Sequence, residues 1–260
     1  TRQQLVMAEV IETKTVNVEH SRFFTAQKNS WWDVNSPLKP LQQLNERALE
    51  YIKDVLVAKG LATDDDGRFQ LRAGLVVLDA GCGGGILTEP LARACPNVTA
   101  IDINRSAIEV AREHAKLDPS LKHLTYHWES FDEHALKNVE KYDVIVCNLV
   151  IHFAVNQEDL LHDLLKTLKP GGTIILSSVC KSYEAWLKII VLGEMVLRRY
   201  ARGNFRWEQF INHWDLEKIL ERNHCTVENI RGLHHDVFPP SYQWSENKNV
   251  FYFMHATKRQ

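Results

Sequence analysis

The sequence lacks several features that would assign the protein to a functional class directly. Its five cysteines lie far apart and include no C-x-x-C pair, which argues against a disulfide framework or a zinc ribbon and suits a reducing compartment. No apolar run approaches the ~20 residues that a membrane-spanning helix requires. The formal net charge of -2 gives no general attraction to nucleic acid, and we expect no nucleic-acid partner.

The N-terminal stretch does not have the composition of a targeting peptide, because Glu9, Glu12 and Glu19 interrupt it. Whether a targeting segment precedes Thr1 stays open. Residues 1–20 are polar and predict a flexible arm, and residues 21–260 predict a single domain that opens with a helical cap over 21–60. Thr63-Asp64-Asp65-Asp66-Gly67 is predicted to be a solvated loop.

What is present indicates an α/β fold. From residue 75 onward, short β-branched runs alternate with segments of helical spacing, which predicts parallel strands joined by right-handed helical crossovers. The expected parallel strands are 76–79, 98–102, 124–129, 142–148 and 173–177, and the expected antiparallel strands are 227–230 and 250–254. We therefore predict a Rossmann-like fold with a mostly parallel seven-stranded sheet.

Residues 182–215 interrupt this alternation and are predicted to be a helical insertion after the fifth strand. The helix expected over 182–200 is apolar around most of its circumference, and arginines follow it. Such a helix can lie on a membrane surface or roof an apolar pocket as a lid. It can equally be buried in the core or in a dimer interface, and the sequence leaves these alternatives open.

The strongest chemical signal follows the first predicted strand, where Asp79 is followed by Ala80 and the run Gly81-Cys82-Gly83-Gly84-Gly85. Glycines at a strand-to-helix turn let a ligand touch the backbone, because no Cβ stands in the way. A glycine pattern alone also fits a dinucleotide site, or a turn that only lets a helix pack closely. Here the glycines follow an acid by two residues, which resembles the first motif of class I S-adenosylmethionine (SAM) methyltransferases.

In such sheets ligands bind beyond the carboxyl ends of the strands. Gly81 and Gly83 would admit the methionine part of SAM. Asp102, with Ile103 beside it, ends the second strand about 20 residues after the glycines, where a carboxylate can accept two hydrogen bonds from a ribose diol. The alternative role for Asp102 is a helix N-cap. Three further strand-end residues are assigned: Glu129 and Ser130 beside the adenine, and Asn148 beside the reactive methyl group.

After its first twenty residues the chain resembles the ubiquinone-biosynthesis O-methyltransferases, which methylate polyprenylated catechols such as demethylubiquinol. Lys169-Pro170-Gly171-Gly172 is a turn that class I methyltransferases share. The more diagnostic segments are Trp31-Trp32-Asp33, Lys39-Pro40-Leu41, Arg202-Gly203 before Trp207-Glu208, Gly232-Leu233-His234 and Trp244-Ser245-Glu246-Asn247. The resemblance implies SAM as cofactor, a polyprenyl quinone precursor as acceptor, and a membrane surface and other ubiquinone-biosynthesis proteins as partners.

The sequences of residues 87–91 and 244–247 are closer to those of the mitochondrial branch of that family. It implies a peripheral protein on the matrix side of the inner mitochondrial membrane rather than in the bacterial cytoplasm.

The acceptor side departs from the family. There the fourth strand ends in a Glu-x-x-Glu-His cluster implicated in binding a divalent metal such as Mg²⁺, whereas this chain has Leu149, His152 and Phe153. A hard cation needs several oxygen ligands, so the metal ligands of the family are not preserved and we assign none. A phenol with a pKa of ~10 still has to lose its proton, and His152 is the best remaining base. A packed histidine is the alternative, and His234 and His235 are weaker candidates.

Three functions follow from these observations. The first is a SAM-dependent O-methyltransferase that acts on a polyprenyl catechol at a membrane surface. The second is a SAM-binding, weakly active or non-catalytic member of a biosynthetic assembly, which the missing acidic cluster would favour. The third is a soluble small-molecule methyltransferase, which would require the apolar helix to be a dimer interface.

Overall fold

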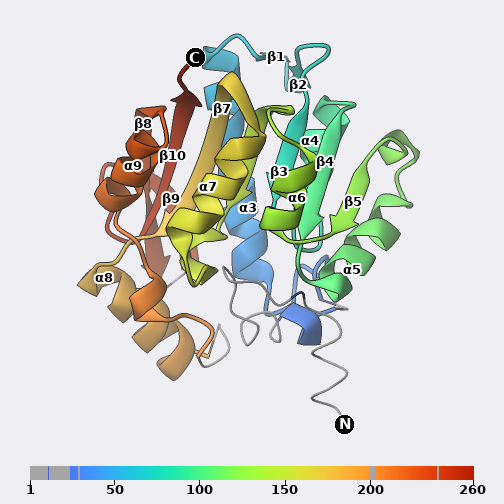
Figure 1. Cartoon of the computed structure of the whole chain (residues 1–260). Helices are drawn as coiled ribbons and strands as arrows, with labels where there is room; N and C mark the ends of the chain where they lie inside the picture. Colours follow the sequence, from blue (N-terminus) through green and yellow to red (C-terminus); the bar gives the residue numbers. More distant parts are fainter. Residues whose placement is uncertain (1–10, 12–23, 29, 199–202, 239) are drawn as a thin grey trace.

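A mixed eight-stranded sheet with the order β5-β4-β3-β6-β7-β10-β8-β9 forms the centre of the protein (Figure 1). The computed structural model describes residues 11, 24–28, 30–198, 203–238 and 240–260. Apart from Ile11, the arm expected over residues 1–20 lies outside the described residues. The backbone N–H of Ile11 donates to the carbonyl oxygen of Ile103 over 3.2 Å, so this residue lies beside the end of a sheet strand.

The five strands that the sequence predicts to be parallel are parallel. They are β3 (Val77–Ala80), β4 (Val98–Asp102), β5 (Thr125–Trp128), β6 (Tyr142–Asn148) and β7 (Leu168–Val179). The antiparallel strands are β8 (Cys225–Val237), β9 (Pro240–Ser245) and β10 (Phe251–Lys258). The α/β fold with a mostly parallel sheet is thus confirmed, but the count of seven strands is wrong, because β9 adds an eighth strand at the edge.

A second correction concerns the predicted loop at residues 63–67, which is part of a hairpin. Strands β1 (Ala62–Asp65) and β2 (Arg68–Leu71) pair antiparallel, and Asp66 and Gly67 connect them with φ angles of +50° and +78°. Two residues in the left-handed region make a turn whose twist matches that of the flanking strands, and Asp-Gly is a preferred pair for it. The sequence signal was present, but the acidic run obscured it.

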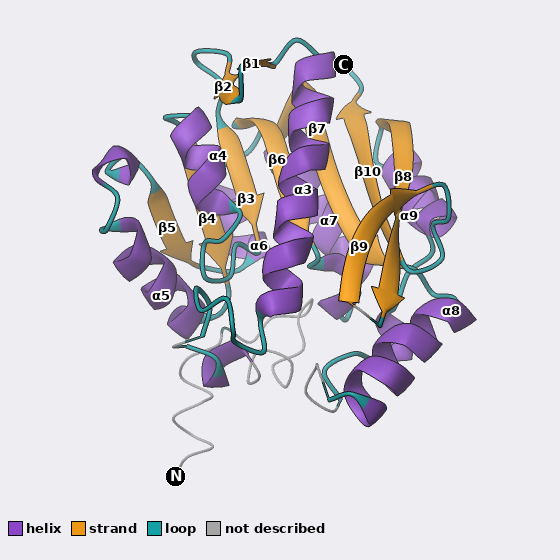
Figure 2. Cartoon of the chain, turned by 180° about the vertical axis from the view of Figure 1, so that it is seen from behind, coloured by secondary structure: helices purple, strands orange, loops and turns teal. Residues whose placement is uncertain are grey.

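Helices cover both faces of the sheet (Figures 1 and 2). One face carries α3 (Lys39–Ala58), α4 (Thr88–Ala94) and α5 (Arg105–Ala115), and the other carries α6 (Phe131–Lys137), α7 (Gln157–Thr167) and α9 (His213–Arg222). Val77 packs into the core on the α3 side and the next residue, Leu78, packs into the core on the α7 side. Burial on both faces explains why these strands are continuous apolar runs rather than alternating ones.

The insertion after β7 is helical, as predicted. Helix α8 (Tyr183–Ala185) continues into the π-helix η3 (Trp186–Val196), which lies at the same end of the molecule as the carboxyl ends of the parallel strands (Figure 2). The helix was expected to reach residue 200, but η3 ends at Val196, and residues 199–202 are outside the described part. Of the helices described, none combines the length and apolarity that crossing a bilayer would require.

The antiparallel part of the sheet depends on a close backbone approach at Gly232 in β8. A Cβ at this position would lie 2.0 Å from the carbonyl oxygen of Asn247. We expect Gly232→Ala to lower the free energy of unfolding by about 1–3 kcal/mol, because the backbone has to move apart to admit the methyl group. Denaturant unfolding measures this, with exposed Thr226→Ala on the same strand as the control. Equal stability of the two variants would contradict this prediction.

Candidate active site

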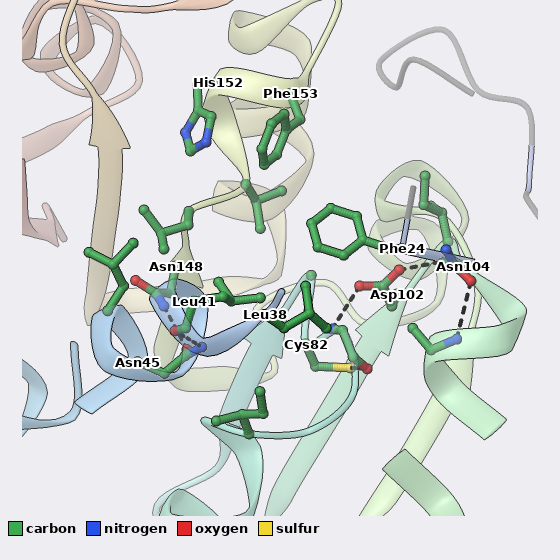
Figure 3. Close-up of a pocket in the computed structure, with 18 of the residues that line it drawn as sticks. Phe24, Leu38, Leu41, Asn45, Cys82, Asp102, Asn104, Asn148, His152 and Phe153 are labelled. Carbon is green, nitrogen blue, oxygen red and sulfur yellow. Dashed lines mark hydrogen bonds between the residues drawn. The ribbon is translucent and has the colours of Figure 1, made fainter. Parts of the chain in front are cut away.

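A cavity opens at the carboxyl ends of β3, β4 and β6, where the glycine loop, the N-terminal segment and α3 meet (Figure 3). Its volume is about 170 Å³, more than ten times the ~10–15 Å³ that one water molecule needs, so it can admit part of a small organic ligand. Most of the lining is apolar, and a few polar side chains lie among these residues. The cavity lies where the chain order of a parallel sheet places a ligand.

The glycine loop forms one wall. Gly81 and Gly83 have φ angles of +83° and +53°, a region that residues with a Cβ avoid. A Cβ on Gly81 would lie 2.3 Å from a methyl group of Val150, and one on Gly83 would lie 2.6 Å from the indole ring of Trp31. The glycines therefore allow close packing as well as exposing backbone to the cavity.

Asp102 lies at the end of β4 and lines the cavity. One of its carboxylate oxygens accepts a hydrogen bond from the backbone N–H of Gly83, and the other accepts one from that of Asn104, each over 2.8 Å. The side chain of Asn104 caps α5, so the N-cap alternative does not account for Asp102. Desolvation raises the pKa of Asp102, and these two N–H groups oppose the rise. A carboxylate has about four acceptor sites, so room remains for a diol, and Ile103 lies beside it.

Asp79, the acid before the glycines, is buried beneath the loop and does not line the cavity. The hydroxyl of Thr88 donates a 2.6 Å hydrogen bond to its carboxylate, which ties the start of α4 to the end of β3. Burial raises the pKa of Asp79 to about 7, the hydrogen bond from Thr88 lowers it, and the nearby charge of Asp102 raises it. This acid therefore supports the loop from below.

Asn148 ends β6 and lines the cavity with Asn45 of α3 (Figure 3). The amide nitrogen of Asn148 donates to the side-chain oxygen of Asn45 over 2.9 Å, and the hydroxyl of Ser177 donates to the Asn148 oxygen over 2.5 Å. The three side chains thus fix one another. Asn45 was not among the predicted site residues, because no local pattern shows that α3 crosses the end of β6.

Glu129 and Ser130 do not line the cavity. The carboxylate of Glu129 contacts His134 over 2.5 Å and Lys137 over 3.1 Å, and Ser130 caps α6. The next residue, Phe131, lines the cavity instead. The adenine role of Glu129 and Ser130 stays a prediction, and Phe131 is a residue that sequence reasoning missed.

His152 lies on η2 (Ile151–Phe153), is buried, and lines the cavity. Its Nδ1 lies 3.4 Å from the hydroxyl of Ser178, and its ring centroid lies 4.1 Å from that of Phe153 and 6.0 Å from that of Phe205. His152 is thus a packed side chain that also lines the cavity.

The two weaker histidine candidates lie elsewhere. His234 contacts Asp236 over 3.1 Å, His235 stacks on Tyr242, and neither lines the cavity.

The surroundings of His152 do not fit a divalent metal. Leu149 and His152 line the cavity at the two positions where the resembling family has glutamates, and Phe153 lines it where that family has the histidine. Within the described part of the chain, no three His, Cys, Asp or Glu side chains come together as metal ligands would. The donor set near His152 is a ring nitrogen, a serine hydroxyl and aromatic rings, and a hard cation prefers several oxygens.

The N-terminal segment closes the cofactor side. Trp32 donates from its indole nitrogen to the carbonyl oxygen of Gly84 over 3.1 Å and stacks on His114 with a centroid distance of 3.5 Å. Trp31 lines the cavity, and its indole nitrogen is buried with no hydrogen-bond partner. An orphaned donor beside open glycine backbone and the Asp102 carboxylate fits SAM, whose methionine carboxylate accepts and whose ribose hydroxyls donate hydrogen bonds.

Comparisons with known proteins identify a methyltransferase. A family model for a methyltransferase domain matches residues 71–235. The mitochondrial ubiquinone biosynthesis O-methyltransferase of Rattus norvegicus is 33% identical over 247 residues, which are 95% of this chain and 71% of that protein. The ubiquinone biosynthesis O-methyltransferase of Vibrio parahaemolyticus is 32% identical over 248 residues, 95% of this chain and 99% of the bacterial one.

Among solved structures, the magnesium protoporphyrin IX methyltransferase of Synechocystis PCC 6803 with bound SAH matches with a TM-score of 0.61. The match covers 91% of this chain and 93% of that one at 20% identity, so it shows a shared fold and nothing more specific. The fold is that of class I SAM-dependent methyltransferases. Since the relatives match almost the whole chain, the protein belongs to the family of ubiquinone biosynthesis O-methyltransferases.

Proposed function

We propose that the protein transfers the methyl group of SAM to a phenolic hydroxyl of a polyprenylated catechol in ubiquinone biosynthesis. The observation that carries this proposal is a single cavity with two chemically different ends. The glycine loop and Asp102 lie at one end, and His152 lies among aromatic rings at the other. The names of the relatives supply the acceptor class.

When bound, SAM supplies an electrophilic methyl group on its sulfonium. Gly81 and Gly83 leave space for its methionine part, and Asp102 accepts hydrogen bonds from its ribose. Phe131 offers an apolar surface for the adenine, next to Glu129 and Ser130. Asn148, fixed by Asn45 and Ser177, borders the reactive end.

The acceptor has to lose a proton as its oxygen forms the bond to carbon, because a phenol with a pKa of ~10 is mostly neutral at physiological pH. His152 takes this proton as the general base, and the hydroxyl of Ser178 near its Nδ1 orients the ring. Phe153 and Phe205 border the same space, and aromatic rings favour stacked or edge-to-face contact with an aromatic acceptor. No step in this scheme depends on a metal.

The insertion helix suits an acceptor with a long apolar tail. Tyr183, Met195 and Val196 are 85%, 52% and 61% exposed, and Trp186 and Leu187 are also exposed. We assign this apolar face, at the end of the molecule where the cavity opens, to the surface of the matrix side of the inner mitochondrial membrane. The insertion would then act both as membrane contact and as a lid for the substrate.

The cofactor assignment predicts that Asp102→Ala weakens SAM binding about 10- to 100-fold, because the hydrogen bonds to the ribose hydroxyls are lost. Isothermal titration with SAM measures this. Glu113→Gln, an exposed carboxylate on α5, is the control and should bind SAM as the unmodified protein does. Unchanged affinity of Asp102→Ala would contradict the ribose role.

The base assignment predicts that His152→Gln lowers turnover at least ~100-fold while SAM affinity stays the same. The assay is methyl transfer from labelled SAM to a short-chain demethylubiquinol, with exposed His127→Gln as the control. The unmodified protein should keep its activity in the presence of a chelator. Near-normal turnover of His152→Gln would refute the role of His152 as the base. Loss of activity in the presence of chelator would refute the metal-free route. If the unmodified protein binds SAM but transfers no methyl group, the role in a biosynthetic assembly is favoured instead.

The membrane assignment predicts that a triple variant with Trp186→Gln, Leu187→Gln and Val196→Gln no longer co-sediments with liposomes, because its apolar contact area is lost. The matched control replaces Leu136 of α6 and Val139, two residues beyond the end of α6, by Gln; both are also exposed. Unchanged co-sedimentation of the triple variant would contradict the assignment. A dimer that dissociates in the triple variant would identify the helix as an interface instead.

A further inference from the structure

Asn204 carries an unexplained polar atom on the acceptor side of the cavity. Its side chain lines the cavity and is 8% exposed, and its Oδ1 is buried without a hydrogen-bond partner. Such orphaned acceptors are rare in proteins, because the lost hydrogen bond to water is not replaced. Of the described side chains with a buried unpartnered atom, Trp31 also lines this cavity, but it lies against the glycine loop on the cofactor side.

The backbone around Asn204 is fixed by a buried charge from the insertion. Glu194 of η3 is 3% exposed, and its two carboxylate oxygens accept hydrogen bonds from the N–H groups of Gly203, over 2.9 Å, and Phe205, over 2.7 Å. These bonds flank Asn204 on both sides. Hydrogen bonds to a carboxylate are about twice as strong as neutral ones. Burial raises the pKa of Glu194, and the backbone N–H groups oppose this rise.

Asn204 lines the same cavity as the proposed base, and the next residue in the loop packs beside that base. The ring centroid of Phe205, the next residue, lies 6.0 Å from that of His152 and 5.6 Å from that of Phe153. The last torsion of an Asn side chain is soft, so the amide oxygen can turn into the cavity when a donor arrives. A hydroxyl group on the acceptor is such a donor, whereas a hydrogen or a methyl ether at the same ring position is not.

We propose that Asn204 is a specificity-determining residue whose side-chain oxygen accepts a hydrogen bond from the second hydroxyl of a catechol, while the first hydroxyl faces His152. Glu194 is the positioning residue that holds Asn204 in this place. The inference rests on the proposed function and adds to it the selection of vicinal diols over monophenols. It assigns a role in recognition, not in proton transfer.

The experiment compares kcat/KM for a short-chain catechol and for the matching phenol that lacks the hydroxyl not methylated. The unmodified protein should prefer the catechol about 10- to 100-fold, and Asn204→Leu should lose most of this preference. SAM affinity should stay within about twofold of the unmodified protein. Because Leu removes an orphaned oxygen, the variant should melt no lower than the unmodified protein.

Two further variants separate recognition from structure. Asn204→Asp keeps acceptor oxygens and should keep the preference. Glu194→Gln should reduce it, since a neutral amide offers one acceptor oxygen where the carboxylate offers two. Glu184→Gln, at the other end of the same helix and paired with Lys188, is the matched control and should change nothing. An unchanged preference in Asn204→Leu would overturn the proposal, and so would a much lower melting temperature, which would show that the oxygen has a structural partner.

Failure of the proposed function is distinguishable from failure of this inference. If the unmodified protein methylates neither phenol, the proposed function fails. Calorimetric titration of the same two phenols into the SAH-saturated protein then tests Asn204 alone. A catechol preference in binding that Asn204→Leu loses supports the inference, and equal binding of both phenols to the unmodified protein overturns it.

Discussion

The site depends on the lack of side chains at the turn between β3 and α4. Gly81 and Gly83 have no Cβ, so Val150 can pack against the backbone of Gly81 and Trp31 against that of Gly83. A side chain at either glycine position would prevent this close approach. The carboxylate of Asp102 then accepts a hydrogen bond from the N–H of Gly83. One constraint on two residues thus brings the N-terminal segment, the end of β4 and the loop after β6 to the same cavity.

The acceptor side is built on a different principle. Aromatic rings and isolated polar groups replace the acidic cluster of the resembling family, and His152 is held among Phe153, Phe205 and Ser178. The insertion contributes to this wall through Glu194, which fixes the loop that carries Asn204 and Phe205. The same helix exposes an apolar face on its outer side. The helix with this exposed apolar face is therefore connected to the acceptor end of the cavity through one buried carboxylate.

The fold could be predicted as far as local pattern and burial agree. Strands buried on both faces are continuous apolar runs, so β3, β4, β6 and β7 were recognisable. Strand β9 was not, because its six residues include a proline and two serines but no β-branched residue. The Asp66-Gly67 turn lies within an acidic run that predicts a solvated loop, although the left-handed angles of a hairpin turn suit this pair.

The sequence by itself determined the fold class and the strand ends at which Gly81, Gly83, Asp102 and Asn148 lie, because the carboxyl ends of parallel strands share one edge of the sheet. Only the tertiary structure decided which neighbours meet there. It places Phe131 rather than Glu129 or Ser130 at the cavity, joins Asn45 to Asn148, and leaves the side-chain oxygen of Asn204 without a partner. Burial and hydrogen-bond partners are set by segments distant in the chain, which no local pattern records.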